Sequence, residues 1–545
     1  MENLLIISLL LGLNSIPQPN QATNQLSDKI VFENFEVSPM SISSENTNQP
    51  TDKVEIKVLC DYENFSYDFA ANANKSVAQQ RSEIFAQGKA YHTQKNQQII
   101  NQIDTDDMDG LYISTYSPYF TYESTLEEVT ANNYEQLNDL ASCSYIEKIY
   151  VSPESQYQPM LEEATEAIGV ADYIDTGILT GEDIVIGVLE PGIVDEDHSN
   201  FNNIDLTVRN EWYFIETVQE HTTRVASIIA KMCPDAKLLS VELSGNAVSE
   251  IDWMLDRNVN VINLSYGDEN ATGNYDSDSA YMDYIVNTYK VTIVAAVGNS
   301  GREAGYVANP ALGYNVIGVG ACPSFSDFPL IWSSYKEING PDKPNILAPG
   351  LDIEITPFVG KYEGTSYSAP IVSSCVALLM EERTDLTIHP EYVLALMMNN
   401  GDRSDEGNTM GLDEYVGAGQ INFEKMMTYI NNIIPITNNS ESVYLTRTFN
   451  VVLLHNQTIR ATAAWLSKAN GNANGTSCTD YDLALIYKSN NEEYVMIHSV
   501  QTYNPFETFT FTLTSEYPEG VYTLRFKQSS DLVQEDHAAL CYKIY

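Results

Sequence analysis

The sequence predicts an α/β protein whose central domain is a doubly wound, mostly parallel sheet. Between residues 162 and 432, short and nearly continuous apolar runs alternate with helical segments, and each run ends at a polar or Gly-rich break. Strands of a parallel sheet read in this way because helices cover both of its faces. The five runs are IVIGVLE, KLLSVEL, NVINLSYG, VTIVAAVGN and NVIGVGA. We expect this domain to span residues 159–432.

The length and the charge of the chain limit what it can be. With 545 residues, two to four domains are expected. The 75 acidic residues outnumber the 28 basic ones and give a net charge of -47. Such a surface repels phosphate backbones and anionic lipid headgroups, which argues against a nucleic-acid or polybasic membrane partner. No apolar run is long enough to span a bilayer.

The first residues predict export. The apolar run from Leu4 to Leu13 suits the core of a signal peptide, so residues 1–20 are assigned to one and the protein is expected to be secreted or held at the cell surface. No Lys or Arg precedes the run, and a buried first strand or helix is the alternative. Residues 21–50 are rich in Asn, Gln, Ser and Pro and predict a flexible lead-in.

Residues 51–158 predict a small ferredoxin-like α+β domain. Strand-like and helical patterns follow one another in the order β-α-β-β-α-β, which is the split βαβ arrangement. Its first and last strands are antiparallel neighbours. Cys60 ends the first strand and Cys143 precedes the last, so a disulfide between them is one hypothesis and two unpaired thiols are the other.

Residues 433–545 predict an all-β sandwich. Six strand-like runs are separated by polar turns, and Tyr522, Leu524 and Phe526 alternate as in a half-buried strand. The runs are TIRATAAWL, DLALIYK, YVMIHSV, FTFTLT, VYTLRFKQ and ALCYKIY. A disulfide between Cys478 and Cys541 is a further hypothesis.

Ser366 is the candidate nucleophile. It lies in GTSYSAP, where a Gly-containing turn leads into an apolar helix. The N–H groups and positive dipole end of that helix suit a serine whose attack creates an oxyanion. The alternative is an ordinary helix cap, although seven residues of pattern exceed what a cap requires. Asn299, in VGNSG at the end of an apolar run, is the candidate amide donor to that oxyanion; taken alone, VGNSG would be read as a turn.

A serine nucleophile needs a base, and the base needs an orienting carboxylate. His221 opens the helix HTTRVASIIAK, and Glu190 ends the run IVIGVLE before a Pro-Gly turn. A carboxylate at the end of a hydrophobic strand is costly unless it is paired. A structural histidine and a solvated strand end are the alternatives.

Together these segments resemble the subtilisin-like serine proteases, with the acid, histidine and serine motifs in that family's chain order. LEPGIVDEDH, HTTRVASIIA, VINLSYG, VGNSG and GTSYSAP carry the resemblance across about 270 residues. It implies a Glu190–His221–Ser366 triad, Asn299 as oxyanion donor, and a substrate cleft lined by the residues Ser265, Tyr266 and Gly267. His198 matches a non-catalytic histidine of the acid motif.

The resemblance also implies the partners. These are a peptide or protein substrate and the chain's own residues 51–158, which resemble the family's prodomain, an intramolecular chaperone and inhibitor. Cleavage is expected between about Pro153 and Ala167. No cofactor is required by such a reaction. Structural calcium ions are common in the family, but the carboxylates are scattered along the sequence, so no calcium site is assigned to particular residues. The C-terminal sandwich resembles accessory domains of some subtilases.

The chain departs from the family pattern around the histidine. Glu190 replaces the usual Asp, and Thr222, Arg224 and Ser227 replace the usual Gly, His and Gly. Either the backbone has adapted to the longer acid or activity is low. Arg224, at i+3, would favour a neutral His221 or would pair with Glu190. A degenerate scaffold that acts as a secreted binding or surface protein is therefore the rival to a secreted serine endopeptidase.

Overall fold

The computed structural model describes residues 29–32, most of 53–153, residues 158 and 159, and residues 167–545 apart from 210–217, 439–443, 469–477 and several shorter gaps. The signal peptide expected at residues 1–20 lies outside the described residues. By its internal contacts the chain divides into two compact units. In the described part of the chain, no helix has both the length and the apolar character needed to cross a membrane.

The first unit contains a five-stranded sheet in the order β1-β5-β2-β4-β3. Its strands are β1 (Ile30–Phe32), β2 (Lys53–Cys60), β3 (Asp109–Ile113), β4 (Tyr119–Thr125) and β5 (Ile146–Pro153), and its helices include α2 (Val77–Ile100) and α4 (Glu135–Ser142). β2 is antiparallel to both β4 and β5, which is the expected ferredoxin-like order. Residues 30–32, predicted to be part of a flexible lead-in, instead pair with β5, because Ile-Val-Phe is a strong strand former.

The second unit is built on a seven-stranded sheet in the order β14-β13-β12-β10-β7-β9-β8. Every pairing in it is parallel. The strands are β7 (Val185–Glu190), β8 (Asp205–Val208), β9 (Lys237–Glu242), β10 (Val261–Leu264), β12 (Thr292–Ala296), β13 (Ile317–Cys322) and β14 (Ile346–Pro349). All five predicted apolar runs form strands here, so the doubly wound parallel sheet is confirmed.

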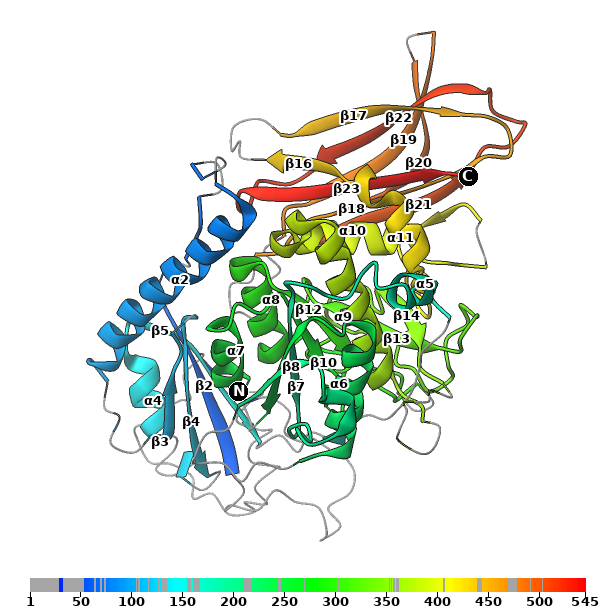
Figure 1. Cartoon of the computed structure of the whole chain (residues 1–545). Coiled ribbons are helices and arrows are strands. Elements are labelled where there is room, and N and C mark those ends of the chain that lie inside the picture. The colour runs from blue at the N-terminus through cyan, green and yellow to red at the C-terminus, as the bar shows by residue number, and fades with distance from the viewer. Residues whose placement is uncertain are drawn as a thin grey trace. The chain divides into compact units, whose positions relative to one another are not determined.

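Helices cover this sheet and seal its core (Figure 1). The long ones are α6 (Glu220–Met232), α8 (Ser277–Tyr289), α9 (Thr365–Glu382) and α10 (Pro390–Asn400). α9 is buried along almost its whole length, and its apolar residues share one core with α6 and with the strands. Because the strands are parallel, their carboxyl ends all meet at one edge of the sheet, where functional residues collect in such folds.

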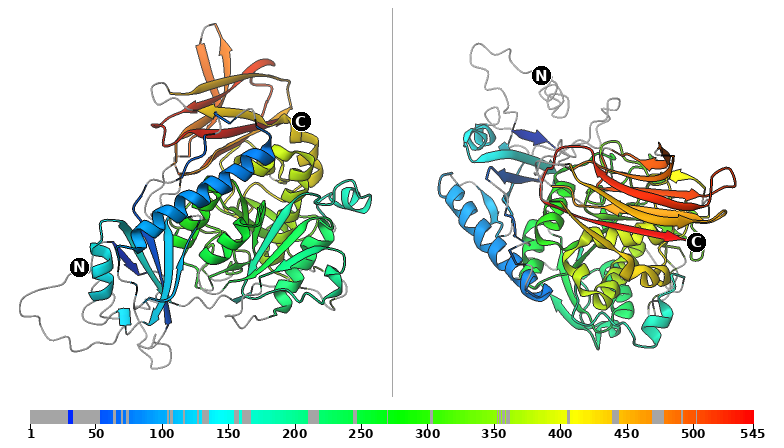
Figure 2. Two further views of the ribbon diagram at one scale, coloured as in Figure 1. Left: turned by 60° about the vertical axis from the view of Figure 1, so that its left-hand side comes forward. Right: turned by 90° about the horizontal axis from the view of Figure 1, so that it is seen from above.

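The C-terminal residues form two antiparallel sheets, which Figure 2 shows as stacked layers of yellow to red strands. Their orders are β15-β21-β18-β23-β16 and β17-β22-β19-β20. The strands are β15 (Thr409–Met410), β16 (Ile434–Asn438), β17 (Thr446–Leu453), β18 (Thr458–Ala464), β19 (Tyr481–Ser489), β20 (Glu492–Ser499), β21 (Phe506–Thr512), β22 (Gly520–Gln528) and β23 (Asp536–Ile544). All six predicted runs are strands, and Tyr522, Leu524 and Phe526 are fully buried between the layers.

A buried arginine joins the sandwich to the parallel-sheet part of the second unit. The Arg460 guanidinium on β18 donates to the carbonyl oxygens of Gly401 (2.7 Å) and Ala418 (2.8 Å). Nearby, the Asn315 side chain exchanges two 2.8 Å hydrogen bonds with the backbone of Ser467. The two bonds from the Arg460 guanidinium are charge-assisted, and such bonds are among the stronger ones in proteins. We therefore expect the sandwich to be firmly attached.

All seven cysteines are free thiols, so neither hypothesised disulfide is formed. Cys60 and Cys143 are neighbours, as the fold requires, and burial together with Cys143 raises the pKa of the Cys60 thiol. The Cys478–Cys541 pairing is wrong for a geometric reason. Cys541 faces the core shared with α10, whereas Cys478 packs against the core between the two β-layers. Successive residues of a strand point to opposite faces, so Cys541 faces away from that inter-sheet core.

A buried carboxyl in the sandwich makes stability depend on pH. Burial raises the pKa of Glu507 on β21 to about 9, although Ser499 and the Gln501 N–H both donate to it. The folded-state value lies above the unfolded one, so stability is lost as the pH rises from about 4.5 toward 9. We expect Glu507→Gln to raise the free energy of unfolding at pH 8 by on the order of 1 kcal/mol or more. The Tm of the variant should therefore exceed that of wild type at pH 8 but not at pH 5. Glu516→Gln, at an exposed position, is the control that should show no such divergence.

Candidate active site

Glu190 and His221 meet at the carboxyl edge of the parallel sheet. Glu190 ends β7 and is fully buried. Its Oε1 accepts a 2.7 Å hydrogen bond from the backbone N–H of Ser265, and its Oε2 lies 3.3 Å from His221 Nδ1. A buried carboxylate is tolerated where donors and a partner compensate its lost hydration. The glutamate is therefore turned inward to the histidine and away from solvent.

Ser366 is the chain neighbour of a residue that contacts His221, but it is not hydrogen-bonded to the Glu190–His221 pair. The His221 ring packs edge-on against Tyr367, with ring centroids 5.5 Å apart, and Tyr367 directly follows Ser366 in the first turn of α9. Ser366 Oγ is fully buried and makes no hydrogen bond to any described residue. The serine–histidine hydrogen bond expected from the sequence is thus absent from this structure. Catalytic hydrogen bonds are often long or poorly aligned until substrate binds.

Asn299 is oriented by Thr365. Both the backbone N–H and the hydroxyl of Thr365 donate to Asn299 Oδ1 at 3.0 Å, and the hydroxyl also accepts from the Gly298 N–H at 3.2 Å. Because a backbone N–H can bond only the oxygen of the amide, the Nδ2 group must point the other way. Asn299 Oδ1 is thereby held against the residue that precedes Ser366, and Nδ2 is left as the donor end of the amide. No role was predicted for Thr365 from the sequence, although it precedes the serine inside GTSYSAP.

A network of buried polar side chains holds the end of β10, which lies between the Glu190–His221 pair and the residues expected to bind substrate. Ser265 Oγ accepts from Asn263 Nδ2 at 2.8 Å, and the hydroxyl of Ser373 on α9 donates to Asn263 Oδ1 at 3.0 Å. All three side chains are buried. The network therefore connects the end of β10 to α9, the helix that contains Ser366. The residue after β10 is Ser265, whose N–H donates to Glu190.

The residues expected to bind substrate form a short strand that already pairs with another segment. β11 (Tyr266–Gly267) is antiparallel to β6 (Gln158–Pro159), with Tyr266 opposite Pro159 and Gly267 opposite Gln158. In this register the paired segment runs from Gly267 toward Ser265, whose N–H holds Glu190. β11 thus accepts an extended chain by backbone pairing.

The departures from the family pattern have local explanations. Arg224 forms an ion pair with Glu220 and lies over the Tyr362 ring, 3.7 Å from its centroid. The expectation that it would draw Glu190 away is wrong, because Glu220 lies one helical turn before it on the same face. The Ser227 hydroxyl donates to the Thr223 carbonyl at 2.6 Å, so a serine fits where the family has glycine. His198 stacks on Phe358, with centroids 4.4 Å apart.

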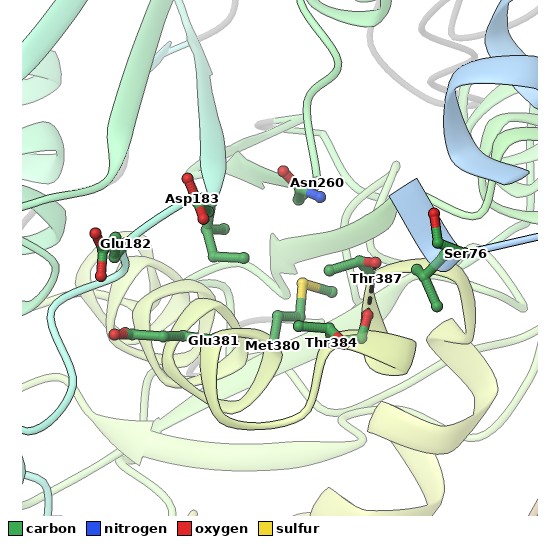
Figure 3. A pocket seen from close by; sticks show the side chains of 10 residues that line it. Ser76, Glu182, Asp183, Asn260, Met380, Glu381, Thr384 and Thr387 are labelled. Carbon is green, nitrogen blue, oxygen red and sulfur yellow. Dashed lines mark hydrogen bonds between the residues drawn. The ribbon is translucent and has the colours of Figure 1, made fainter. Parts of the chain in front are cut away.

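Two other features bear on cofactors and ligands. Within the described residues, no group of three or more His, Cys, Asp or Glu side chains is placed to hold a metal ion, so calcium stays unassigned. A pocket of about 710 Å³ is lined by Glu182, Asp183 and Glu381, which Figure 3 shows along one side of it. It lies at the amino end of β7, about 20 Å of strand away from Glu190, so it is no part of the candidate active site.

The comparisons with known proteins assign a family to the parallel-sheet segment. Residues 166–419 match the profile of the subtilase family, "Peptidase_S8". This segment belongs to the subtilase family. The resemblance inferred from the motifs is confirmed, and the subtilase segment contains Glu190, His221, Asn299 and Ser366 together with all seven parallel strands.

Two curated relatives of the subtilase segment are proteases by name. The chain is 25% identical to serine protease AprX of Bacillus subtilis over 354 residues, which cover 54% of this chain and 77% of AprX. It is 30% identical to human membrane-bound transcription factor site-1 protease over 230 residues, 37% of this chain and 21% of that one. Among solved structures it is similar to the prenylagaramide maturation protease PagA (26% identity, TM-score 0.40), covering 48% of this chain and 98% of PagA.

Proposed function

We propose that this protein is a serine endopeptidase that cleaves peptide bonds through an acyl-enzyme. The observation that carries the proposal is the 3.3 Å approach of Glu190 Oε2 to His221 Nδ1, beside α9, the helix whose second residue is Ser366. A carboxylate on Nδ1 leaves Nε2 as the basic nitrogen of the neutral imidazole.

Each step has a residue to perform it. Ser366 Oγ attacks the substrate carbonyl while His221 takes its proton, and the imidazolium that forms is stabilised by Glu190. The oxyanion accepts hydrogen bonds from Asn299 Nδ2 and from the Ser366 N–H in the open first turn of α9. His221 then passes the proton to the leaving amine, and water repeats the sequence on the acyl-enzyme.

The N-terminal unit fits a role as a prodomain. It has the ferredoxin-like strand order, and the chain that leaves it supplies β6, which pairs with β11. A segment held there would occupy the strand that a substrate needs and so would inhibit the protease until it was cut. Such a zymogen suits a secreted protein, and secretion is part of this proposal.

One observation favours the rival function, a binding or surface protein on an inactive subtilase scaffold. Ser366 Oγ is buried and makes no hydrogen bond within the described chain. A nucleophile that never reaches its base would leave the fold intact and the chemistry absent.

A fluorophosphonate probe separates the two. We expect purified protein, freed of its N-terminal unit, to be labelled at Ser366 and to hydrolyse casein, because an activated serine reacts with the probe as with a substrate. Ser366→Ala should show neither labelling nor hydrolysis. Its free energy of unfolding should stay within about 1 kcal/mol of the wild-type value. A well-folded wild type that takes up no label would establish the inactive scaffold.

The longer acid makes a prediction of its own. Glu190→Asp shortens the side chain by about 1 Å, so the carboxylate can no longer reach both the Ser265 N–H and His221. We expect kcat to fall roughly 10-fold to 100-fold with little change in KM. Glu190→Gln, which keeps the shape but loses the charge, should lower kcat by about 10³ to 10⁴. If Glu190→Asp is faster than wild type, the backbone has not adapted to glutamate.

The register of β6 predicts where the chain is cut during maturation. Pro159 lies opposite Tyr266, and in a continued register the next residue would face Ser265, whose N–H holds Glu190; we propose that the bond after that residue, Met160–Leu161, is the one presented to Ser366. Most of the stretch from Pro153 to Ala167, within which cleavage was expected, lies outside the described residues: these are 154–157 and 160–166. We expect N-terminal sequencing of the mature protein to begin at Leu161, and Ser366→Ala to remain uncut. A mature N-terminus before Gln158 or after Ala167 would rule out this register.

A further inference from the structure

The helix that contains the candidate nucleophile carries a second buried serine on the same face. α9 runs from Thr365 to Glu382 and is buried as far as Met380. Ser366 and Ser373 are seven residues apart, which is two helical turns and about 10 Å along the axis. Residues at this spacing share one face of a helix. Ser373 therefore lies on the same side of α9 as the candidate nucleophile.

Ser373 differs from its neighbour Ser374 in where its hydroxyl donates. Both side chains are fully buried. The Ser374 hydroxyl donates to the Pro370 carbonyl of its own helix at 2.8 Å, which is a common way for a helix to satisfy a buried serine. The Ser373 hydroxyl instead donates across to β10, to Asn263 Oδ1 at 3.0 Å. Because a buried serine needs no partner outside its helix, burial alone does not explain the bond from Ser373 to the sheet.

From Asn263 the hydrogen bonds continue to the acid. Asn263 Nδ2 donates to Ser265 Oγ at 2.8 Å, and the Ser265 backbone N–H donates to Glu190 Oε1 at 2.7 Å. Both ends of the Asn263 amide are thus bonded, which fixes its orientation. The side chains of Asn263, Ser265 and Glu190 are fully buried, where a lost hydrogen bond is not replaced by one to bulk water. The bonds therefore join Ser373 to the carboxylate by way of Ser265.

A glutamate needs such a support more than a shorter acid does. Its side chain has one more rotatable bond than that of aspartate, so an anchored Oε1 is needed to hold Oε2 at 3.3 Å from His221 Nδ1. The imidazole of His221 also contacts α9, through the ring of Tyr367. The helix of the nucleophile thus contacts the base directly and is connected to the acid through Asn263.

We infer that Ser373 and Asn263 are positioning residues for Glu190, which hold the acid in a fixed place relative to the helix of the nucleophile. This inference rests on the proposed function. Both residues act through the Ser265 N–H and not on the reacting atoms. Catalytic groups must be held within about 0.5 Å of the productive geometry, and hydrogen bonds from surrounding residues supply that precision.

The test compares the two neighbouring serines. Ser373→Ala removes the bond to Asn263, whereas the matched control Ser374→Ala removes an identical hydroxyl whose bond stays within α9. kcat and KM are measured with a quenched peptide made from the sequence that is cut fastest in a casein digest. Each variant is also combined with Glu190→Asp, whose shorter carboxylate no longer reaches both the Ser265 N–H and His221.

We expect Ser373→Ala to lower kcat about tenfold with KM unchanged, because only the position of the acid is disturbed. Ser374→Ala should match wild type in both constants. In the Glu190→Asp background, Ser373→Ala should cause no further loss, since the anchor that it supports is already gone. Asn263→Leu, which is similar in size but makes neither bond, should repeat the tenfold loss and replaces Ser373→Ala if that variant does not fold.

Equal losses for the two serine variants, or the same loss from Ser373→Ala in both backgrounds, overturn the inference while the proposed function stands. A measurement without turnover separates the two further. With the imidazole protonated, the Nδ1 proton of His221 gives an NMR resonance that moves downfield as its hydrogen bond to Glu190 strengthens. We expect this resonance to move upfield in Ser373→Ala and to keep its wild-type position in Ser374→Ala. A wild type that neither cleaves peptide nor takes up fluorophosphonate overturns the proposed function; an unchanged resonance in Ser373→Ala overturns the inference.

Discussion

The backbone N–H of Ser265 donates to Glu190 Oε1, and the arrangement of the candidate site depends on that bond. A glutamate is longer than the aspartate of related sequences, and without a second anchor its carboxylate would swing through several rotamers. The Ser265 N–H holds one oxygen and so leaves the other facing His221. Because Ser265 directly precedes β11, the same short segment positions the acid and begins the strand expected to bind substrate.

The parallel sheet explains why residues distant in sequence converge here. Glu190 ends β7, Ser265 follows β10 and Asn299 follows β12, and these three strands are neighbours in the sheet. The convergence was predictable from apolar runs that each end at a polar break, since period and length identify buried parallel strands. β8 and β14 were not identified as strands, because each is four residues long and lies at an edge of the sheet, where the pattern is weakest.

What the sequence could not supply was the direction of side chains. Arg224 was placed correctly on the helical face of His221, but its partner could not be inferred, because Tyr362 lies far along the chain and Glu220 competes with Glu190 for the same charge. The predicted Cys478–Cys541 disulfide is wrong for a similar reason. Alternation along a strand shows that neighbouring residues face opposite sides, but it does not show which side faces the second β-layer. Thr365 was overlooked because a threonine beside a serine looks like a cap, and its bond to Asn299 exists only in three dimensions.

The substitutions around His221 therefore do not by themselves argue for a dead scaffold. Arg224 is neutralised by Glu220 and covered by an aromatic ring, and the Ser227 hydroxyl is satisfied within its own helix. These two changes leave the contacts of Glu190 and Asn299 in place, whereas the buried Thr222 Oγ1 makes no hydrogen bond to any described residue. What still separates an active site from an inactive one is the hydrogen bonding within the site: Glu190 Oε2 lies 3.3 Å from His221 Nδ1 without a hydrogen bond, and Ser366 Oγ bonds to no described residue. A buried polar atom without a hydrogen bond costs free energy, so a substrate whose binding completed the bonds among these atoms would stabilise the catalytic arrangement.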